Sequence, residues 1–471
     1  MRRTVPISLL LSAGLAAQVP SVDRMLQRSM HQNMAMQQQM SVMHQMHSQV
    51  AAARARALRN RTISAVKASE ALQQEPFAMP PTVLKWQHPL PEWRFLPCLE
   101  DGRVLSFNSV TEVPFGRKHE VTTEFIRCLD AESGKTTWEH RVEGEVETWP
   151  LFFGNLAVYG SKSYQIVALD SASGAEKFRI QLEALKPFLS RPDITKVHLP
   201  ILEGERLYVA IHGKGSTGDG IGHLYSIDTQ NGKKIWDCLL EAGAANPPLV
   251  HEDLLLIGGG SWITGIHARN GEVAWRTWTG GKEVSDPGMI LGGKLLMKAG
   301  PELLALDPST GKLLWRSPQP GFSPIQGDEQ NLIFLEQRLF GSTWAVGVDT
   351  GTGKQAWEVK VGSGWEVWWS MGGTAFISKG NEAKGIALKD GKTQWSVTLP
   401  GKVGLNPWPQ GDLMLIVAEE KKKATLHALR FKDGTSAWTF PVPIRLGEGS
   451  LAVYPEGIFV PSKDKNLVFL K

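Results

Sequence analysis

The segment Ala305-Leu-Asp-Pro-Ser-Thr-Gly311-Lys-Leu-Leu-Trp315 joins a short apolar run, a turn and an aromatic residue. Its Asp can bond its own downstream backbone, its Pro presets φ, and its Gly accepts a positive φ, so the centre predicts a tight turn between two strands. Eight variants of this phrase occur, and their final aromatic residues step by 40, 58, 39, 40, 42, 38 and 43 residues. A period of about 40 residues built from short strands is typical of a β-propeller.

The eight aromatic residues form one series along the chain: Trp138, Phe178, Trp236, Trp275, Trp315, Trp357, Trp395 and Trp438. Residues 287–315 predict four short antiparallel strands with the aromatic residue on the fourth, outermost one. A large ring at that position can cover the neighbouring blade while an indole N–H donates to a carbonyl. These aromatic residues are therefore interpreted as structural rather than as a ligand stack.

The ends of the repeat region predict a closed ring. Residues 451–470 supply three strands without a fourth, and residues 83–86 supply a fourth strand without the other three. Pairing them in one sheet removes the exposed edges. The fold expected for residues 81–471 is thus an all-β propeller of four-stranded antiparallel blades. Eight blades are favoured because residues 108–124 interrupt the first repeat, and nine remain the alternative.

Charge is unevenly distributed along the chain. The formal net charge is +4, and residues 1–80 carry a balance of +6, so the remainder sums to −2. A nearly neutral ring has no electrostatic footprint for nucleic acid. Residues 1–17 have a basic start, a short apolar core and small residues, which predict a secretory signal peptide. That apolar core is too short to span a bilayer, and the first cysteine is Cys98, so a periplasmic or secreted protein without a lipid anchor is expected.

Residues 18–80 predict a tail of a different kind, helical or disordered and rich in Met, Gln and His. The tail is a candidate for self-association. Thioether and imidazole groups are also ligands for Cu(I), which makes a copper-binding envelope protein one alternative. A biased composition without any ligand is the plainer interpretation, and we prefer it. Cys98, Cys128 and Cys238 are too few for a disulfide framework. A bridge between the first two is conceivable, but buried apolar strand residues are favoured.

The phrase Ala-Leu-Asp-x-x-x-Gly-x-x-x-Trp, matched fully by residues 305–315, resembles the repeat of the pyrroloquinoline-quinone (PQQ)-like propeller family. The resemblance implies one of two functional kinds: quinoprotein dehydrogenases that bind PQQ and calcium, or non-catalytic scaffolds such as the assembly factor BamB. The dehydrogenases typically carry adjacent cysteines, which this chain lacks. No catalytic, cofactor or metal residues are assigned. A non-catalytic scaffold that binds a protein or another cell-envelope component is expected, with a PQQ- and calcium-dependent dehydrogenase as the alternative.

Two departures from the repeat mark candidate binding regions. The 58-residue step makes the third repeat about 18 residues longer than its neighbours, and its extra length includes His212 and Asp219. Long insertions in such rings lie on one rim, where binding often occurs. The second departure is Trp365, Trp368 and Trp369, which precede or begin an inner strand. They are interpreted as either an apolar contact patch or packing between blades, and the packing interpretation is preferred.

Overall fold

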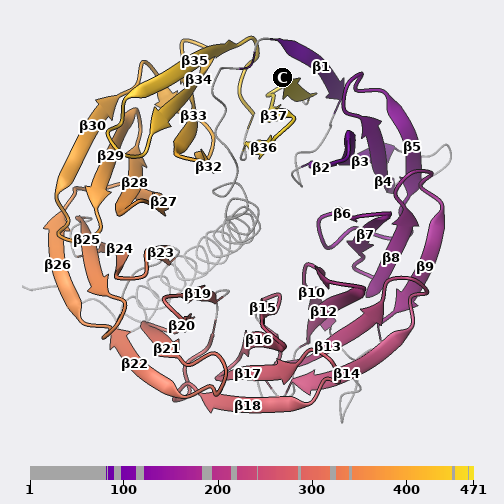
Figure 1. The fold of residues 1–471 in the computed structure, drawn as a ribbon. Coiled ribbons are helices and arrows are strands. Elements are labelled where there is room, and N and C mark those ends of the chain that lie inside the picture. The colour runs from indigo at the N-terminus through magenta and orange to yellow at the C-terminus, as the bar shows by residue number, and fades with distance from the viewer. Residues whose placement is uncertain are drawn as a thin grey trace, which may run out of the picture. The chain divides into compact units, whose positions relative to one another are not determined.

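The computed structural model describes residues 81, 83–89, 97–112, 121–182, 194–213, 220–240, 242–244, 246–284, 288–318, 325–338, 342–447, 451–464 and 466–471. Within these residues every regular element is a strand, and the strands form nine antiparallel sheets arranged as a ring (Figure 1). The predicted signal peptide (residues 1–17), the predicted tail (residues 18–80) and Asp219 lie outside the described residues.

The first four sheets follow chain order. The first contains β2 (Cys98–Glu100), β3 (Arg103–Glu112), β4 (Val121–Asp130) and β5 (Thr136–Arg141). The second contains β6 (Leu151–Phe153), β7 (Leu156–Gly160), β8 (Gln165–Asp170) and β9 (Glu176–Gln181). The third contains β10 (Ile194–Val197), β11 (Ile201–Glu203), β12 (Arg206–Gly213), β13 (Ile221–Asp228) and β14 (Lys234–Leu240). The fourth contains β15 (Leu249–His251), β16 (Leu254–Gly259), β17 (Trp262–His267) and β18 (Val273–Trp278).

The next four sheets repeat the plan. The fifth contains β19 (Met289–Leu291), β20 (Lys294–Ala299), β21 (Glu302–Leu306) and β22 (Leu313–Pro318). The sixth contains β23 (Gln326–Gly327), β24 (Asn331–Gln337), β25 (Thr343–Asp349) and β26 (Gln355–Lys360). The seventh contains β27 (Glu366–Met371), β28 (Thr374–Lys379), β29 (Glu382–Ala387) and β30 (Thr393–Thr398). The eighth contains β31 (Lys402–Val403), β32 (Trp408–Gln410), β33 (Leu413–Glu420), β34 (Lys423–Arg430) and β35 (Ser436–Val442).

The ninth sheet joins the two ends of the repeat region, as the sequence predicts. Its order is β1 (Leu84–Pro89), β38 (Asn466–Leu470), β37 (Gly457–Pro461) and β36 (Ala452–Tyr454). Main-chain bonds extend the pairing in both directions between Val83 and Lys471, at N···O distances of 3.2 and 3.1 Å. The carboxylate of Glu132, in the first blade, forms ion pairs with Lys85 and Lys471. Closure thus involves the first blade as well as the ninth.

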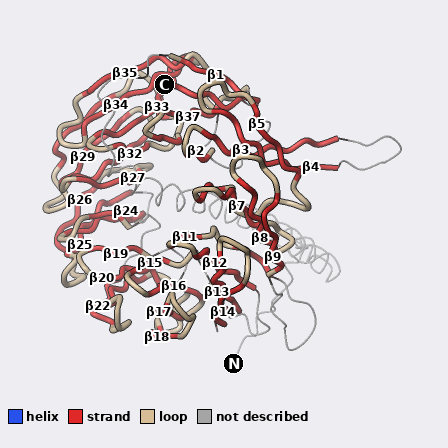
Figure 2. Tube along the Cα trace, turned by 45° about the vertical axis from the view of Figure 1, so that its right-hand side comes forward, coloured by secondary structure: helices blue, strands red, loops and turns tan. Residues whose placement is uncertain are grey.

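The number of blades among the described residues is nine, the alternative left open by the sequence, and the preference for eight is corrected. The first repeat is a genuine blade. β3 and β4 pair in continuous register from Arg103–Asp130 to Glu112–Val121, although β5 pairs with β4 only over Phe125–Leu129. Figure 2 shows this hairpin extending beyond its neighbours. The apparent interruption in the sequence is therefore a longer hairpin inside one blade.

The aromatic anchors act between blades, as predicted. Seven indoles donate their N–H to a carbonyl of the following blade, with the following N···O distances: Trp86 to Ala131 2.8 Å, Trp138 to Ser171 3.1 Å, Trp236 to Ala268 3.1 Å, Trp275 to Pro308 3.1 Å, Trp315 to Thr350 3.1 Å, Trp357 to Leu388 2.7 Å and Trp395 to Phe431 2.8 Å. A buried polar group with a partner avoids the desolvation cost of an unpaired one. Each bond fixes one blade against the next.

The turn glycine of each repeat provides the surface on which the preceding anchor packs. Gly311 has a φ of +69°, and a Cβ built on it would lie 2.2 Å from Cε3 of Trp275. Asp307, which opens the turn, accepts from the backbone N–H groups of Ser309 and Thr310 at 3.0 and 2.9 Å. These bonds hold the pKa of the Asp307 carboxyl below its ordinary value. The repeated Asp, Gly and Trp are thus one device for stacking blades.

The hydrophobic core lies between neighbouring sheets. One cluster joins Tyr208, Ala210 and Leu224 of the third blade to Leu255 and Ile266 of the fourth. Cys98, Cys128 and Cys238 are buried, and none of the three is in a disulfide bond, which confirms the preference for apolar strand residues. Among the described residues, no helix is long and apolar enough to cross a membrane.

Candidate functional site

The side chains of Trp365 and Trp369 are buried within the propeller. Trp365 is 6% exposed and packs in a cluster with Ile333, Leu335 and Val367, and the Lys384 ammonium lies 4.4 Å from the centre of its ring. Trp369 is 9% exposed. These contacts are those expected if the two indoles pack between blades.

Trp368, the remaining indole of this group, is more accessible. It donates its Nε1–H to Oγ of Ser378 on the adjacent strand at 2.7 Å, whereas Trp369 donates its Nε1–H to the carbonyl of Pro407 in the eighth blade at 3.0 Å. The Trp368 side chain is half-buried. A contact patch at these three residues stays a prediction, and Trp368 offers it the most surface.

His212 lies at the end of β12, against two glycines. A Cβ built on Gly220 would lie 2.4 Å from its Cε1, and one built on Gly243 would lie 2.4 Å from its Nδ1. Burial, followed by the positive charge of Lys196, holds the pKa of His212 below its ordinary value. Nearby, Nε2 of His198 lies 2.7 Å from the carbonyl oxygen of Ala244. The two histidines therefore support the short loop that carries Gly243 and Ala244.

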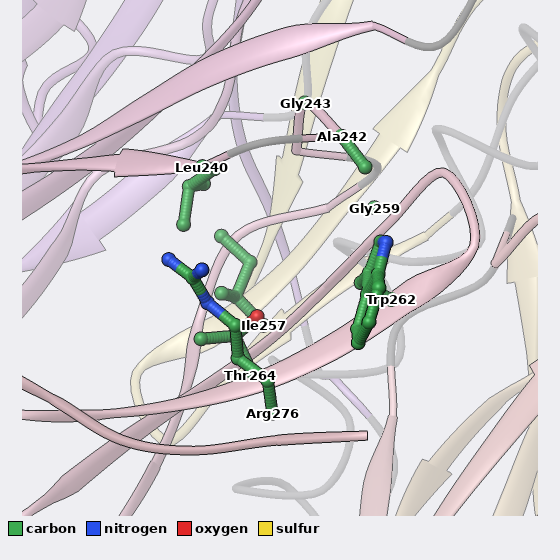
Figure 3. A pocket seen from close by; sticks show the side chains of 8 residues that line it. All are labelled: Leu240, Ala242, Gly243, Ile257, Gly259, Trp262, Thr264 and Arg276. Carbon is green, nitrogen blue, oxygen red and sulfur yellow. The ribbon is translucent and has the colours of Figure 1, made fainter. Parts of the chain in front are cut away.

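The other side of that loop lines a small hollow between the third and fourth blades. Leu240, Ala242 and Gly243 form the wall from the third blade, and Ile257, Gly259, Trp262, Thr264 and Arg276 form the wall from the fourth. In Figure 3 the Trp262 indole and the Arg276 guanidinium stand on opposite sides of the hollow, with Ile257 and Thr264 between them. Aromatic, apolar and cationic groups thus share one concave surface beside the enlarged third repeat.

The strand pairing of the fourth blade places Trp278 on the same face. Trp262 is the cross-strand partner of Trp278, and Thr264 is the partner of Arg276. Directly opposite residues in antiparallel strands project to the same side. Trp278 is 59% exposed, on the outer strand at the rim of the ring (Figure 1). Trp278 therefore extends the surface of the hollow outward.

Trp262, Arg276 and Trp278 were not predicted from the sequence, although the repeat contains a signal for Trp278. The residue three positions after each anchor is, in chain order, Arg141, Gln181, Leu239, Trp278, Pro318, Lys360, Thr398 and Pro441. Charged side chains and Pro at such edge positions discourage pairing with another strand. Two large apolar residues stand there instead, Leu239 at 52% exposure and Trp278. They belong to the two blades that form the hollow.

No three His, Cys, Asp or Glu side chains gather closely enough to hold a metal ion, as far as the structure describes the chain. The arrangement at the hollow, with its indoles, guanidinium and apolar floor, is chemistry of recognition rather than of proton transfer or nucleophilic attack.

Fold and site together define a β-propeller protein built from PQQ-like repeats. The profile of the family described as outer membrane protein assembly factor BamB matches residues 86–237, 195–333 and 342–471. The chain belongs to this family. No curated protein sequence matches it.

Three solved structures illustrate its likeness to other propellers. BamB from Moraxella catarrhalis is 13% identical, with 83% of this chain and 99% of that chain covered and a TM-score of 0.47. The quinohemoprotein alcohol dehydrogenase of Comamonas testosteroni is 11% identical, with 88% and 79% covered and a TM-score of 0.46. The quinohemoprotein alcohol dehydrogenase ADHIIG of Pseudomonas putida HK5 is 12% identical, with 80% and 71% covered and a TM-score of 0.46. Likeness at this level carries no information about activity.

Proposed function

We propose that this protein is a non-catalytic scaffold of the cell envelope, periplasmic or secreted, which binds a protein partner at the hollow between its third and fourth blades. The observation that carries the proposal is the exposure of Trp278. At 59% exposure, this indole presents a large apolar surface beside Trp262 and Arg276. Trp and Arg are enriched at the energetic centres of protein interfaces. Membership of the BamB family supports an envelope role.

Site-specific cross-linking tests this function. A photoreactive amino acid is placed at position 278 of the full chain, and the protein is irradiated in envelope extract. The matched control carries the same group at Leu314, which is 45% exposed on the outer strand of the fifth blade. We expect a discrete cross-linked protein from position 278 and not from position 314. Equal products from both positions, or none from either, would refute a docking site at the hollow.

The proposal includes no cofactor. The competing possibility is a quinoprotein dehydrogenase, for which the purified chain is mixed with PQQ and Ca²⁺ and assayed for cofactor absorbance and alcohol-dependent dye reduction. We expect neither signal above that of a heat-denatured sample. Stoichiometric retention of PQQ with dye reduction would replace the scaffold function by an enzymatic one.

A further inference from the structure

A group of exposed cations lies at one end of the eighth and ninth blades, across the ring from the hollow (Figure 1). Some of them form the hairpin tips between β33 and β34 and between β37 and β38, and the others lie where the chain enters each blade. In an antiparallel blade these two places are at the same end of the strands. We name the group the basic patch, and it consists of Lys402, Lys421, Lys422, Lys423, Arg445 and Lys463.

Strand pairing and backbone bonds join these cations into one surface. Lys402 is the cross-strand partner of Glu419, whose carboxylate accepts from the N–H of Leu446 at 3.2 Å. The carbonyl of Arg445 accepts from the N–H of Lys463 at 2.9 Å. The contacts therefore continue across the boundary between the eighth and ninth blades.

The positive charge of the basic patch exceeds that of its acidic neighbours. The carboxylates interspersed with the six cations are those of Glu419, Glu420 and Asp464, which leaves a net charge of +3. Among the described residues, the one ion pair that the patch forms joins Lys421 to Glu420 at 3.8 Å. Because residues 81–471 sum to −2, the patch is a local positive region on a ring of the opposite net charge.

Hairpin tips at the same end of other blades have their cations neutralised. Lys162, at the tip between β7 and β8, forms an ion pair with Glu145. Arg338, which follows β24, forms ion pairs with Glu336 and Glu358 at 2.9 and 2.7 Å. The excess charge is therefore particular to the eighth and ninth blades and is not a general property of the tips.

The tip of the eighth blade has lysines where the backbone disfavours them. Lys421 and Lys422 have φ values of +48° and +68°, in the left-handed region that is unfavourable for a residue with a Cβ. Asn-Gly and similar pairs usually occupy such a turn, and the two-residue tips of the fourth, fifth and seventh blades begin with Gly260, Gly300 and Gly380. Backbone strain of this kind is characteristic of functional positions.

We propose that the basic patch docks the propeller on an anionic membrane surface of the cell envelope, where its side chains contact the phosphate groups of lipid headgroups. This contact is separate from the binding of a protein at the hollow and goes beyond the scaffold function. It requires no membrane-spanning segment, because the attraction acts between the patch and the surface of the bilayer.

The composition of the patch favours lipid over a protein partner. Five of its six cations are lysines, whose compact ammonium groups stay strongly hydrated. Lys is depleted at protein interfaces, where Arg and aromatic residues are enriched. Near an anionic leaflet, by contrast, each exposed cation increases the affinity about fivefold. The hollow and the basic patch thus fit two different kinds of partner.

Co-sedimentation with vesicles tests the proposal. The full chain is mixed with vesicles of phosphatidylcholine alone, or of phosphatidylcholine and phosphatidylglycerol in equal parts, and the bound fraction is measured. We expect binding to the anionic vesicles only. This binding should be lost when the salt concentration rises from about 0.1 M to about 1 M, because the screening length falls from about 10 Å to about 3 Å.

A variant that carries Lys421→Gln, Lys422→Gln and Lys423→Gln should bind the anionic vesicles more weakly by at least about tenfold. A second variant with Lys421→Asn and Lys422→Gly restores the usual residues of the turn. It should unfold at a higher temperature than the unchanged protein and yet bind the vesicles more weakly, a combination that misfolding cannot produce.

The matched control carries Lys233→Gln, Lys312→Gln and Lys354→Gln. These lysines are exposed at turns between the third and fourth strands of their blades, at the opposite end of the strands from the patch. The control has the same net charge as the triple variant, and both keep the basic residues 1–80. It should bind the vesicles as the unchanged protein does.

Three results would overturn membrane docking. Equal binding to neutral and anionic vesicles would remove the electrostatic basis, and so would the absence of binding to both. Equal losses in the triple variant and its control would show that net charge, and not the patch, determines binding. Tighter binding to soluble poly-glutamate than to vesicles of equal charge would assign the patch to an acidic protein instead.

Discussion

Replacing Gly311 with Ala adds one methyl group where the structure brings two blades together. The Gly311 φ of +69° lies in the left-handed region, which costs a residue with a Cβ about 1–2 kcal/mol. The added Cβ would lie 2.2 Å from Cε3 of Trp275, and overpacking of this kind costs about 1–3 kcal/mol. We therefore expect Gly311→Ala to lower the free energy of unfolding by about 2–5 kcal/mol.

Gly293 provides a matched control in the same blade. Its φ is +70°, and a Cβ built on it meets nothing within 4 Å. Gly293→Ala should therefore show only the backbone cost, and the difference between the two variants, about 1–3 kcal/mol, measures the contact between blades. Urea unfolding followed by circular dichroism gives both values, provided that the slope with urea is unchanged.

A double-mutant cycle separates the methyl–indole contact from other effects. In a Trp275→Ala background the contacts of the new methyl group with the indole disappear, and the approach to Oγ1 of Thr277 at 2.9 Å remains. Adding Gly311→Ala should then cost less than it does in the otherwise unchanged protein, by most of the difference between Gly311→Ala and Gly293→Ala. Equal destabilisation by Gly311→Ala and Gly293→Ala, or the same Gly311→Ala cost with and without the indole, would refute the role assigned to the turn glycine.

Three further outcomes are expected. The ion pairs of Glu132 with Lys85 and Lys471 hold the pKa of this carboxyl at about 2 rather than 4.5, so the stabilisation they give is present above pH 4.5 and is lost as the pH falls toward 2. The wild-type protein should therefore lose more thermal stability than Glu132→Gln between pH 5 and 2, and identical losses would contradict this. Cys98, Cys128 and Cys238 are buried, and burial raises the pKa of the Cys128 and Cys238 thiols, so iodoacetamide should modify none of the three until denaturant is added, as read by intact mass. Trp365→Ala should lower the free energy of unfolding by about 3–5 kcal/mol, and Trp368→Ala should lower it clearly less, because Trp365 is buried and Trp368 is only half-buried. The reverse order in urea unfolding would count against packing of Trp365 between blades.

The fold was largely predictable because each repeat contains the residues that pack it against the next repeat. The roles of Asp307, Gly311 and Trp315 depend on the geometry of one turn and on the equivalent residues of the adjacent blade, so the period of the sequence was enough to predict the blades and their stacking. The blade count was harder to predict because pairing of β3 with β4 continues past the ends of their neighbours. A sequence pattern tuned to short strands treats such a hairpin as an interruption.

The candidate site was less predictable because it depends on two blades at once. His212 was singled out from the length of its repeat, and it supports the loop behind the hollow. Trp262 and Arg276 looked ordinary in sequence, since nothing local indicates that Leu240 of the preceding blade faces them. Trp278 was detectable by comparing the same position across repeats, whereas clustered tryptophans are the more conspicuous local signal.

The ninth sheet has a consequence for the order in which this protein folds. Leu84 pairs with Leu470, almost the full length of the ring away in sequence, whereas every other blade is assembled from contiguous chain. Contacts between distant residues form slowly because the intervening chain must first be brought together. Closure of the ring is therefore expected to be the late kinetic step. The finished ring buries Leu99 and Val104 of the first blade together with Phe459. Until closure occurs, these two side chains are exposed to whatever surrounds the newly made chain.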